Sequence, residues 1–400
     1  GCIYKSHKQE KSMFYDIIKT LFNQRKIYKG MMFDAKKKGD DESEKLYDSR
    51  QMAYKILLNS LYGVMAQRFF RFYSLDLASS VTLTGQELIK FAGDHVDNYM
   101  VSKDLSLNKN FSTDCEVSRE YLKYCDTDSL FIWMKPYIES KGKKATVETV
   151  EEETKNIQTI LNTTILDMYC KLHSIPKEES MLELKNELIC KRYYALSAKK
   201  KYGLNVVSNE GVSTNFNKIT GIETRRSDFS ELTKEMLTHI LDNILIPENI
   251  SIPEIFEYAD KIETEARLRA RKGDSTIFKS VSFSKPFEEY KALPQHIKGM
   301  LIWNELEYDH FRYGTRGTLF PLKGIDLMKA PETVKHNFYT KFSEKFTNSD
   351  LDVIVAPDDV ETLPDYYIVD VEKVIKFAIT DRVGILLEPL AKKEEEVLTW

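Results

Sequence analysis

The chain has 400 residues, of which 42% are hydrophobic and 30% are charged, and its formal net charge at pH 7 is -4. These proportions are those of a folded globular protein, and the length favours two or three subdomains. No apolar run is long enough to cross a bilayer and the N-terminus lacks signal-peptide features, so we expect no membrane insertion.

The five cysteines form no Cys-x-x-Cys pair, which argues against a zinc site or a disulfide framework and favours a reducing compartment. The net charge alone disfavours a nucleic-acid partner, but Lys and Arg occur in local runs that matter more than the total.

The N-terminal part of the chain predicts two helices joined by a polar tip. Apolar residues recur at helical spacing from Ser12 to about Phe33, and a second helical pattern runs from about Ser43 to Phe70. Between them, Gly39 lies in a stretch rich in Lys and Asp and is a candidate helix C-cap. We therefore expect an antiparallel helical hairpin.

Both helices carry polar residues at helical spacing. Arg25 and Lys29 are spaced i, i+4 in the first helix. The second helix places three residues on one face, followed by a glycine: Lys55, Asn59, Tyr62 and Gly63. For either helix alone, a solvated surface is the better explanation. If the two helices face each other and direct their cations inward, they would form a site for a polyanion, and a Tyr beside a Gly offers a flat surface for a base.

Further along, two aspartates lie between short apolar segments. The stretch Tyr124-Cys125-Asp126-Thr127-Asp128-Ser129 follows Leu122 and precedes an apolar run, so it predicts two β-strands joined by a tight turn. Because strand side chains alternate, we expect Asp126 and Asp128 to project together. Two nearby carboxylates either share a proton or bind a hard divalent cation. A bare Asp-x-Asp is most often a solvated acidic turn, but apolar strands on both sides favour a metal site on a rigid element.

The middle of the chain predicts helices over about 76–100 and 147–173 and strands over 191–196 and 202–207. We expect helices on one face of an antiparallel sheet, an α+β unit with the aspartate hairpin on its open face. Three lysines, Lys199, Lys200 and Lys201, lie between the two strands. They are either a solvated basic turn or a phosphate contact, and a metal hairpin in the same unit favours the contact.

From Phe229 onward the patterns are mainly helical, with helices expected over about 232–245, 253–271, 297–307 and 369–379. The second of these ends in a basic turn with Arg269 and Arg271, which suits either a helix C-terminus or duplex phosphates. The acidic and apolar tail from Glu394 to Trp400 is either frayed or a peptide that docks on another protein.

Three motifs, in this order, resemble those of family B DNA polymerases. They are Lys55-Ile56-Leu57-Leu58-Asn59-Ser60-Leu61-Tyr62-Gly63, the Tyr-Cys-Asp-Thr-Asp-Ser hairpin, and Ala198-Lys199-Lys200-Lys201-Tyr202. In the third motif, Lys201 stands where Arg is commoner. The resemblance is closest to the polymerases of T4-like bacteriophages and extends over nearly the whole chain, including the segments 22–26, 221–224 and 294–299.

The resemblance implies an α+β fold in three domains. Residues 1–72 would form the fingers, an antiparallel helical hairpin, and residues 73–228 the palm, an antiparallel sheet with packed helices and the catalytic hairpin. Residues 229–400 would form a mainly helical thumb and a C-terminal tail.

The resemblance also implies template-directed addition of deoxynucleotides to a primer 3′ hydroxyl during DNA replication, with two Mg²⁺ ions as cofactors. Asp126 and Asp128 would be the catalytic metal ligands, Asp128 being the firmer one. The nucleotide would contact residues of the fingers: Arg25, Lys29, Lys55, Asn59, Tyr62 and Gly63. The primer-template duplex would contact residues of the palm and thumb: Lys199, Lys200, Lys201, Tyr202, Arg269 and Arg271.

Two parts of the family pattern are expected outside this sequence. One is a motif preceding the fingers, with another metal-binding Asp and a Tyr that excludes ribonucleotides, and the other is the proofreading exonuclease domain. We therefore expect a C-terminal portion of a polymerase that is active only with its N-terminal portion. Primer-template DNA and a dNTP are expected partners, and a sliding clamp is a further candidate, although the tail matches the clamp-binding pattern poorly. The resemblance implies a viral protein in the cytoplasm of an infected bacterial host.

Three alternatives remain open. The first is an inactive, polymerase-like subunit that only binds duplex, although both aspartates and the three cations of the fingers weigh against it. The second is a polymerase that uses RNA as template or product, although the Asp-Thr-Asp pattern favours DNA. The third is a self-contained small-molecule enzyme, which no Rossmann-type or Walker glycine pattern supports.

Overall fold

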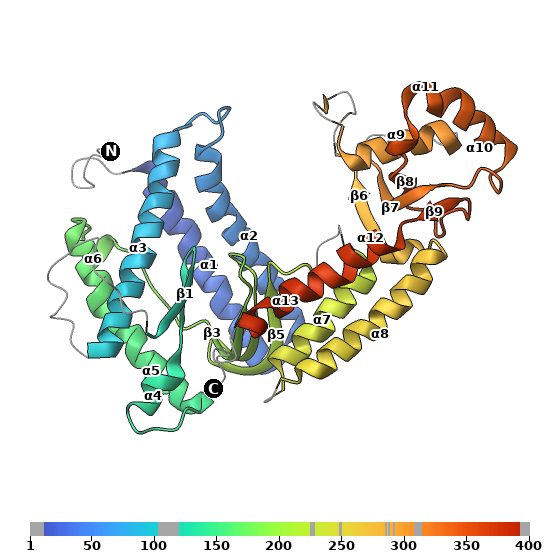
Figure 1. Ribbon diagram of the computed structural model, residues 1–400. Helices are drawn as coiled ribbons and strands as arrows, with labels where there is room; N and C mark the ends of the chain where they lie inside the picture. The colour runs from blue at the N-terminus through green and yellow to red at the C-terminus, as the bar shows by residue number, and fades with distance from the viewer. Residues whose placement is uncertain are drawn as a thin grey trace. The chain divides into compact units, whose positions relative to one another are not determined.

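The computed structural model describes residues 12–102, 120–224, 229–247, 250–284, 286, 289–290, 293–307 and 314–392 (Figure 1). The chain separates into two compact units. The first unit comprises Gly1–Lys144 and Glu152–Lys185, and the second comprises Ala145–Glu151 and Asn186–Trp400. Each unit has its own cluster of buried apolar side chains. Helices and antiparallel sheets together confirm the α+β class.

The first unit begins with two antiparallel helices, α1 (Met13–Lys38) and α2 (Asp41–Met65), which lie side by side in Figure 1. Gly39 ends α1 with a left-handed φ of 69°, and the side chain of Asp40 caps α2. Tyr28 of α1 stacks on Tyr54 of α2 with ring centroids 5.6 Å apart, so aromatic contact holds the two helices together. The predicted helical hairpin and its C-cap glycine are confirmed.

The core of the first unit forms around α3 (Leu75–Ser102). Its buried residues Ala92, Val96 and Met100 pack in one apolar cluster with Ile165 and Tyr169. The segments that follow are α4 (Met134–Glu139), α5 (Val147–Ile160), a π-helical turn (Leu161–Ile165), α6 (Leu166–Leu172) and a 3₁₀ turn (Lys177–Glu179). The helices predicted over 76–100 and 147–173 are therefore confirmed, the second with a π-helical turn inside it.

A β-hairpin, β1 (Leu122–Asp126) and β2 (Ser129–Ile132), forms a two-stranded sheet by itself. Both strands contact α3, and Figure 1 shows β1 alongside that helix. The sequence pattern predicts the hairpin on the open face of a larger sheet in the same unit. Instead it is seated on a helix, and the larger sheet belongs to the second unit.

That larger sheet is three-stranded and antiparallel, in the order β3 (Leu188–Ala195), β4 (Tyr202–Asn209) and β5 (Val212–Thr220). The first two strands confirm the prediction. The sequence did not predict β5, because Ser, Thr, Asn and Lys dominate it and most of its residues are not buried. Such a polar strand is typical of a sheet edge.

The helices of the C-terminal third include α7 (Glu231–Leu245), α8 (Ile252–Arg271), α9 (Gln295–Glu307), α10 (Glu332–Asn337), α11 (Ser343–Lys345), α12 (Val371–Ile375) and α13 (Asp381–Lys392). The helices α7, α8 and α9 confirm the first three predicted helices. The fourth, over about 369–379, corresponds to α12 and the π-helical turn that joins it to α13. Buried apolar residues of α7, α9 and α13 belong to the core cluster of the second unit. No helix within the described ranges is both long and apolar enough to span a membrane.

The same third also contains a sheet of β6 (Lys279–Ser282), β7 (Arg316–Ile325), β8 (Val353–Pro357) and β9 (Tyr367–Val369). The region is mainly helical, as expected, and this sheet is an addition that the sequence pattern does not predict. The sequence pattern does not indicate the central strand β7, because Pro321 interrupts its apolar run and a glycine lies near each end of it. Pro321 lies at the end of the pairing between β7 and β8, where the missing N–H is tolerated.

Candidate active site

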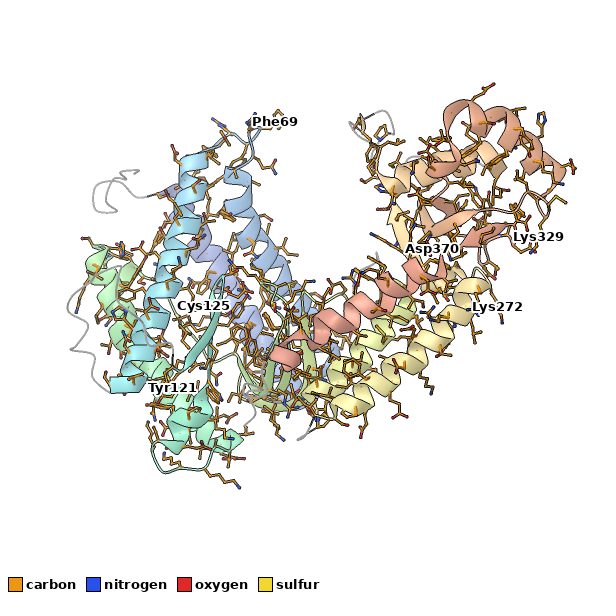
Figure 2. All side chains as sticks on the ribbon, viewed as in Figure 1. Phe69, Tyr121, Cys125, Lys272, Lys329 and Asp370 are labelled. Atoms are coloured by element: carbon orange, nitrogen blue, oxygen red, sulfur yellow. The ribbon has the colours of Figure 1, made fainter. Side chains whose placement is uncertain are left out.

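The tip of the hairpin carries Asp126 and Asp128 on either side of Thr127 (Figure 2 labels the neighbouring Cys125). Asp126 ends β1, and Thr127 has a φ of 56°, an unusual value for a β-branched residue. The N–H of Asp128 donates a hydrogen bond of 2.6 Å to the carbonyl oxygen of Asp126. The predicted tight turn is confirmed, but strand alternation does not continue across it. Alternation is therefore not a valid reason for the two carboxylates to project together.

The two carboxylates differ in surroundings. Asp126 is half-buried and accepts a hydrogen bond of 3.0 Å from Thr127 Oγ1, whereas Asp128 is exposed. Carboxylate oxygens on a rigid turn suit a hard divalent cation such as Mg²⁺. Within the described ranges, no group of three or more His, Cys, Asp or Glu side chains could hold a metal ion. Asp126 and Asp128 thus fit part of a metal coordination shell.

A β-bulge in β1 decides which way Asp126 faces. The pairing of β1 with β2 shifts by one residue at Lys123, which has no opposite residue. As a result, Leu122 and Cys125 both lie next to Gly93 of α3, although they are three positions apart. Asp126 follows Cys125 in regular strand and therefore faces away from α3.

On α1, Arg25 and Lys29 lie one turn apart and are half-buried. Nε of Arg25 is buried and has no hydrogen-bond partner among the described residues. The ammonium of Lys29 lies 5.9 Å from the centre of the Phe33 ring. This face of α1 is therefore suited to bind an anion.

On α2, the side chains of Lys55, Asn59 and Tyr62 are all exposed. The neighbouring Tyr54 is the residue that stacks on α1. The expectation that the second helix directs its cation toward the first stays a prediction. These residues line an open face, beside Gly63, whose Cα has no neighbour where a Cβ would lie.

The basic turn joins β3 to β4, as predicted. The N–H of Leu196 donates a hydrogen bond of 2.9 Å to the carbonyl oxygen of Lys201 and closes the turn. Lys199 and Lys200 are exposed, and Lys200 has a left-handed φ of 63°. Tyr202 is buried, with its ring centroid 5.9 Å from that of a tyrosine of β3. The turn therefore presents its first two lysines to solvent and holds the tyrosine inside the sheet.

The segment after β5 forms the back of this turn. The ammonium of Lys201 forms an ion pair with Glu223, which is buried. A Cβ added to Gly221 would collide with the carbonyl oxygen of Lys200, so only glycine fits there. The sequence resemblance included residues 221–224 but assigned them no role. Their contacts with Lys200 and Lys201 indicate that this segment supports the basic turn.

At the end of α8, the two predicted arginines differ. Nη2 of Arg269 lies 2.6 Å from Glu265 Oε1, one turn earlier, and Nε lies 4.0 Å from Asp274. Arg271 is exposed and forms no ion pair with any residue that the structure describes. Arg271 is therefore the more available of the two for a phosphate.

Two residues of α3 that position the hairpin escaped the sequence analysis. Gly93 allows the close contact described above, and Asp97 is a fully buried carboxylate that binds backbone N–H groups at the start of β1. Asp97 could have been found from the sequence, because it is an acidic residue within the apolar pattern of a helix. Such a residue must find polar partners when it is buried.

Comparison with known proteins bears on all these regions. The profile of DNA polymerase family B matches residues 2–298, most of the chain. The chain belongs to DNA polymerase family B. It is 29% identical over 284 residues to a DNA polymerase of Pyrococcus glycovorans, which covers 70% of this chain and 30% of the relative. Over 289 residues it is 25% identical to a DNA-directed DNA polymerase of Enterobacteria phage T4, covering 66% of this chain and 30% of the relative.

The predicted family is thus confirmed, with archaeal as well as phage relatives. A DNA polymerase of Paramecium bursaria Chlorella virus NY2A is 27% identical over 227 residues, covering 56% of this chain and 21% of the relative. The chain spans less than a third of the length of these family B polymerases. Every candidate site residue, from Arg25 to Arg271, lies within the part that matches the family.

Proposed function

We propose that the chain is the C-terminal part of a DNA-directed DNA polymerase that adds deoxynucleotides to a primer 3′ hydroxyl. The observation that carries this proposal is the hairpin tip, where Asp126 and Asp128 flank a tight turn seated on α3 and Asp126 faces away from that helix. Asp126 and Asp128 would hold Mg²⁺ through carboxylate oxygens. A pair of bound Mg²⁺ ions supplies activation of the primer hydroxyl and stabilisation of the pyrophosphate leaving group.

The triphosphate would bind the cations of the first two helices. Arg25, Lys29 and Lys55 supply the positive charge that suits an anion. Family resemblance assigns the nascent base pair to Tyr62 and Gly63. Their exposure on α2 is consistent with that role, since the ring of Tyr62 and the open space beside Gly63 leave room for a base.

The same proposal assigns Asn59 to support of the second helix, although its side chain is exposed. Duplex DNA would contact the basic turn and the end of α8. These contacts involve Lys199, Lys200, Lys201, Tyr202, Arg269 and Arg271. Contacts to phosphates and to the minor groove tolerate any sequence, as a replicating enzyme requires. The exposed Lys199, Lys200 and Arg271 are the residues best placed for phosphate contact.

The proposal includes three domains, with fingers at 1–72, palm at 73–228 and thumb with tail at 229–400. It also includes an N-terminal portion that carries a further metal-binding Asp and the exonuclease. The tail proposed as a clamp contact, residues 394–400, lies outside the described residues. Action in the cytoplasm of an infected bacterial host stays a prediction.

Primer extension with Mg²⁺ and dNTPs tests the proposal, using the chain alone and mixed with the polypeptide that carries the upstream portion. We expect extension only in the mixture. Asp126→Asn and Asp128→Asn should each lower the rate by about a hundred-fold or more, because a metal ligand stabilises the transition state by several kcal/mol. The exposed Glu139→Gln, on the helix after the hairpin, is the matched control and should leave the rate unchanged.

Each alternative gives its own outcome. Extension by the chain alone would contradict the divided active site. Full activity of Asp128→Asn, or duplex binding without any extension, would favour the inactive duplex-binding subunit. Competition between ribonucleotides and deoxyribonucleotides in the active mixture would separate an RNA-using polymerase from the DNA polymerase proposed here.

A further inference from the structure

We infer that Asp97 and Gly93 of α3 are positioning residues that fix the direction in which the Asp126–Asp128 turn faces. The inference rests on the proposed function, since it assigns the two residues a role in the proposed metal site. Both lie on the same face of α3, one turn apart. Neither lies at the tip of the hairpin, so they would act through the backbone of β1.

Asp97 holds the strand at its start. Its carboxylate is fully buried and accepts backbone hydrogen bonds from three consecutive residues. Oδ1 accepts from the N–H of Tyr121 and of Leu122, each at 2.7 Å, and Oδ2 accepts from that of Glu120 at 3.2 Å. Hydrogen bonds to an ionised carboxylate are stronger than neutral ones. Three converging bonds therefore fix where β1 begins on α3 (Figure 2 labels Tyr121).

Gly93 holds the same strand nearer its tip, through close contact. A Cβ at this position would lie 2.8 Å from Leu122 Cδ2, 3.2 Å from Leu130 Cδ2 and 3.5 Å from Cys125 Sγ. Leu130 and Cys125 are directly paired across the hairpin, so one face of both strands rests on this glycine. A larger residue there would require the side chain of Leu122 to move, because its Cδ2 lies within 3.0 Å of the added carbon.

The two contacts bracket the bulge at Lys123. Asp97 binds Leu122 before the bulge, and Gly93 accommodates Cys125 after it. A slip by one residue in this strand would exchange its two faces and turn Asp126 toward α3. Because both contacts depend on the bulged register, together they select the arrangement in which Asp126 faces away from the helix.

The test uses Asp97→Asn and Gly93→Ala in the full chain, mixed with the upstream polypeptide. Asn keeps the shape of Asp97 but loses the charge and one acceptor, while Ala at position 93 places a methyl group 2.8 Å from Leu122 Cδ2 and crowds the contact with the hairpin. Val96→Ala is the matched control, because Val96 is fully buried on the same helix and belongs to the apolar cluster of the first unit rather than to the hydrogen bonds that hold β1. The readouts are amide hydrogen exchange at Tyr121 and Leu122, duplex affinity by fluorescence anisotropy, and the Mg²⁺ concentration that gives half-maximal incorporation.

We expect faster exchange of the two amides in Asp97→Asn and unchanged duplex affinity in both variants. The half-saturating Mg²⁺ concentration should rise by about ten- to a hundred-fold, as is usual when a group that orients a metal ligand is lost. Val96→Ala should lower the thermal midpoint without changing the Mg²⁺ requirement.

An unchanged Mg²⁺ requirement in Asp97→Asn and Gly93→Ala would overturn the inference, and so would an equal rise in Val96→Ala. If the wild-type mixture does not extend a primer, or if Asp128→Asn extends it fully, the proposed function fails instead. In that case unchanged exchange at Tyr121 and Leu122 would still refute the anchoring of β1 by Asp97.

Discussion

The ammonium of Lys201 forms an ion pair with the carboxylate of Glu223, 22 residues later in the chain. The side chain of Glu223 is 9% exposed and that of Lys201 26% exposed, so water screens the pair only in part. The pair ties the turn between β3 and β4 to the segment after β5. Lys201 therefore stabilises the basic turn from behind, while Lys199 and Lys200 face solvent.

Replacing Glu223 by Gln should loosen the basic turn. The change leaves the half-buried ammonium of Lys201 without its counter-charge, and we expect the free energy of unfolding to fall by about 1–3 kcal/mol. Duplex affinity should fall as well, because the turn is less well ordered. Urea denaturation and fluorescence anisotropy measure the two effects. Glu231→Gln removes an ion pair whose carboxylate is 73% exposed and should change stability by less than about 1 kcal/mol; an equal loss there would contradict the account.

Replacing Gly221 by Ala should destabilise the second unit through a backbone collision. Gly221 has a φ of 68°, and its Cβ would strike the carbonyl oxygen of Lys200. Gly142→Ala is the control, because Gly142 has a φ of 70° but nothing within 4 Å of the added carbon. Both variants carry left-handed strain of about 1–2 kcal/mol, and only Gly221→Ala adds the collision. Equal urea midpoints for the two variants would show that the collision is relieved at no cost.

Replacing Arg271 by Ala should weaken duplex binding more than replacing Arg269. Arg269 is already paired with Glu265, whereas Arg271 is exposed at the end of the same helix. A lost phosphate contact lowers the slope of log affinity against log salt by about 1. Anisotropy titrations over a range of salt concentrations measure this slope. The reverse order of the two variants would place the duplex on the other side of α8.

The acid stability of the first unit should depend on Glu153. This buried carboxylate accepts hydrogen bonds from Lys141 at 2.7 Å and from Lys143 at 3.0 Å, and the bond from Lys141 is the main cause that lowers its pKa below 4.5. Since the folded pKa is lower than the unfolded one, the stabilisation is full above the unfolded pKa and is lost as pH falls through the folded pKa. Glu153→Gln should flatten this acid limb, measured as urea midpoints between about pH 6 and pH 3. An unchanged pH dependence would exclude Glu153 as its source.

Local patterns were sufficient to predict much of the fold. Helical spacing gave the hairpin of α1 and α2, Gly39 gave its C-cap, and the apolar segments on both sides of Asp126 gave the two strands. They failed where tertiary contact or edge position decides the structure. The polar edge strand β5 lacks an apolar face, and Pro321 interrupts the strand pattern of β7.

The candidate site was likewise predictable only in part. The motifs identified which residues belong to the site, but the directions in which their side chains point depend on contacts with residues distant in sequence. The bulge at Lys123 has no local signature, because Asp97 and Gly93 on another element select its register. Likewise, nothing near Lys201 in the sequence indicates its pairing with Glu223.

The most direct test of the central claim is a change of metal preference at Asp128. In the active mixture, Asp128→Cys replaces a hard oxygen ligand by a soft thiolate, which disfavours Mg²⁺ and favours softer metals. We predict that single-nucleotide incorporation is lost with Mg²⁺ and is partly restored when Cd²⁺ or Mn²⁺ is added. Asp128→Ala should not be restored by either metal, and the exposed Glu139→Cys should behave as the wild type. Undiminished incorporation with Mg²⁺ by Asp128→Cys would contradict the claim that this carboxylate holds the catalytic metal.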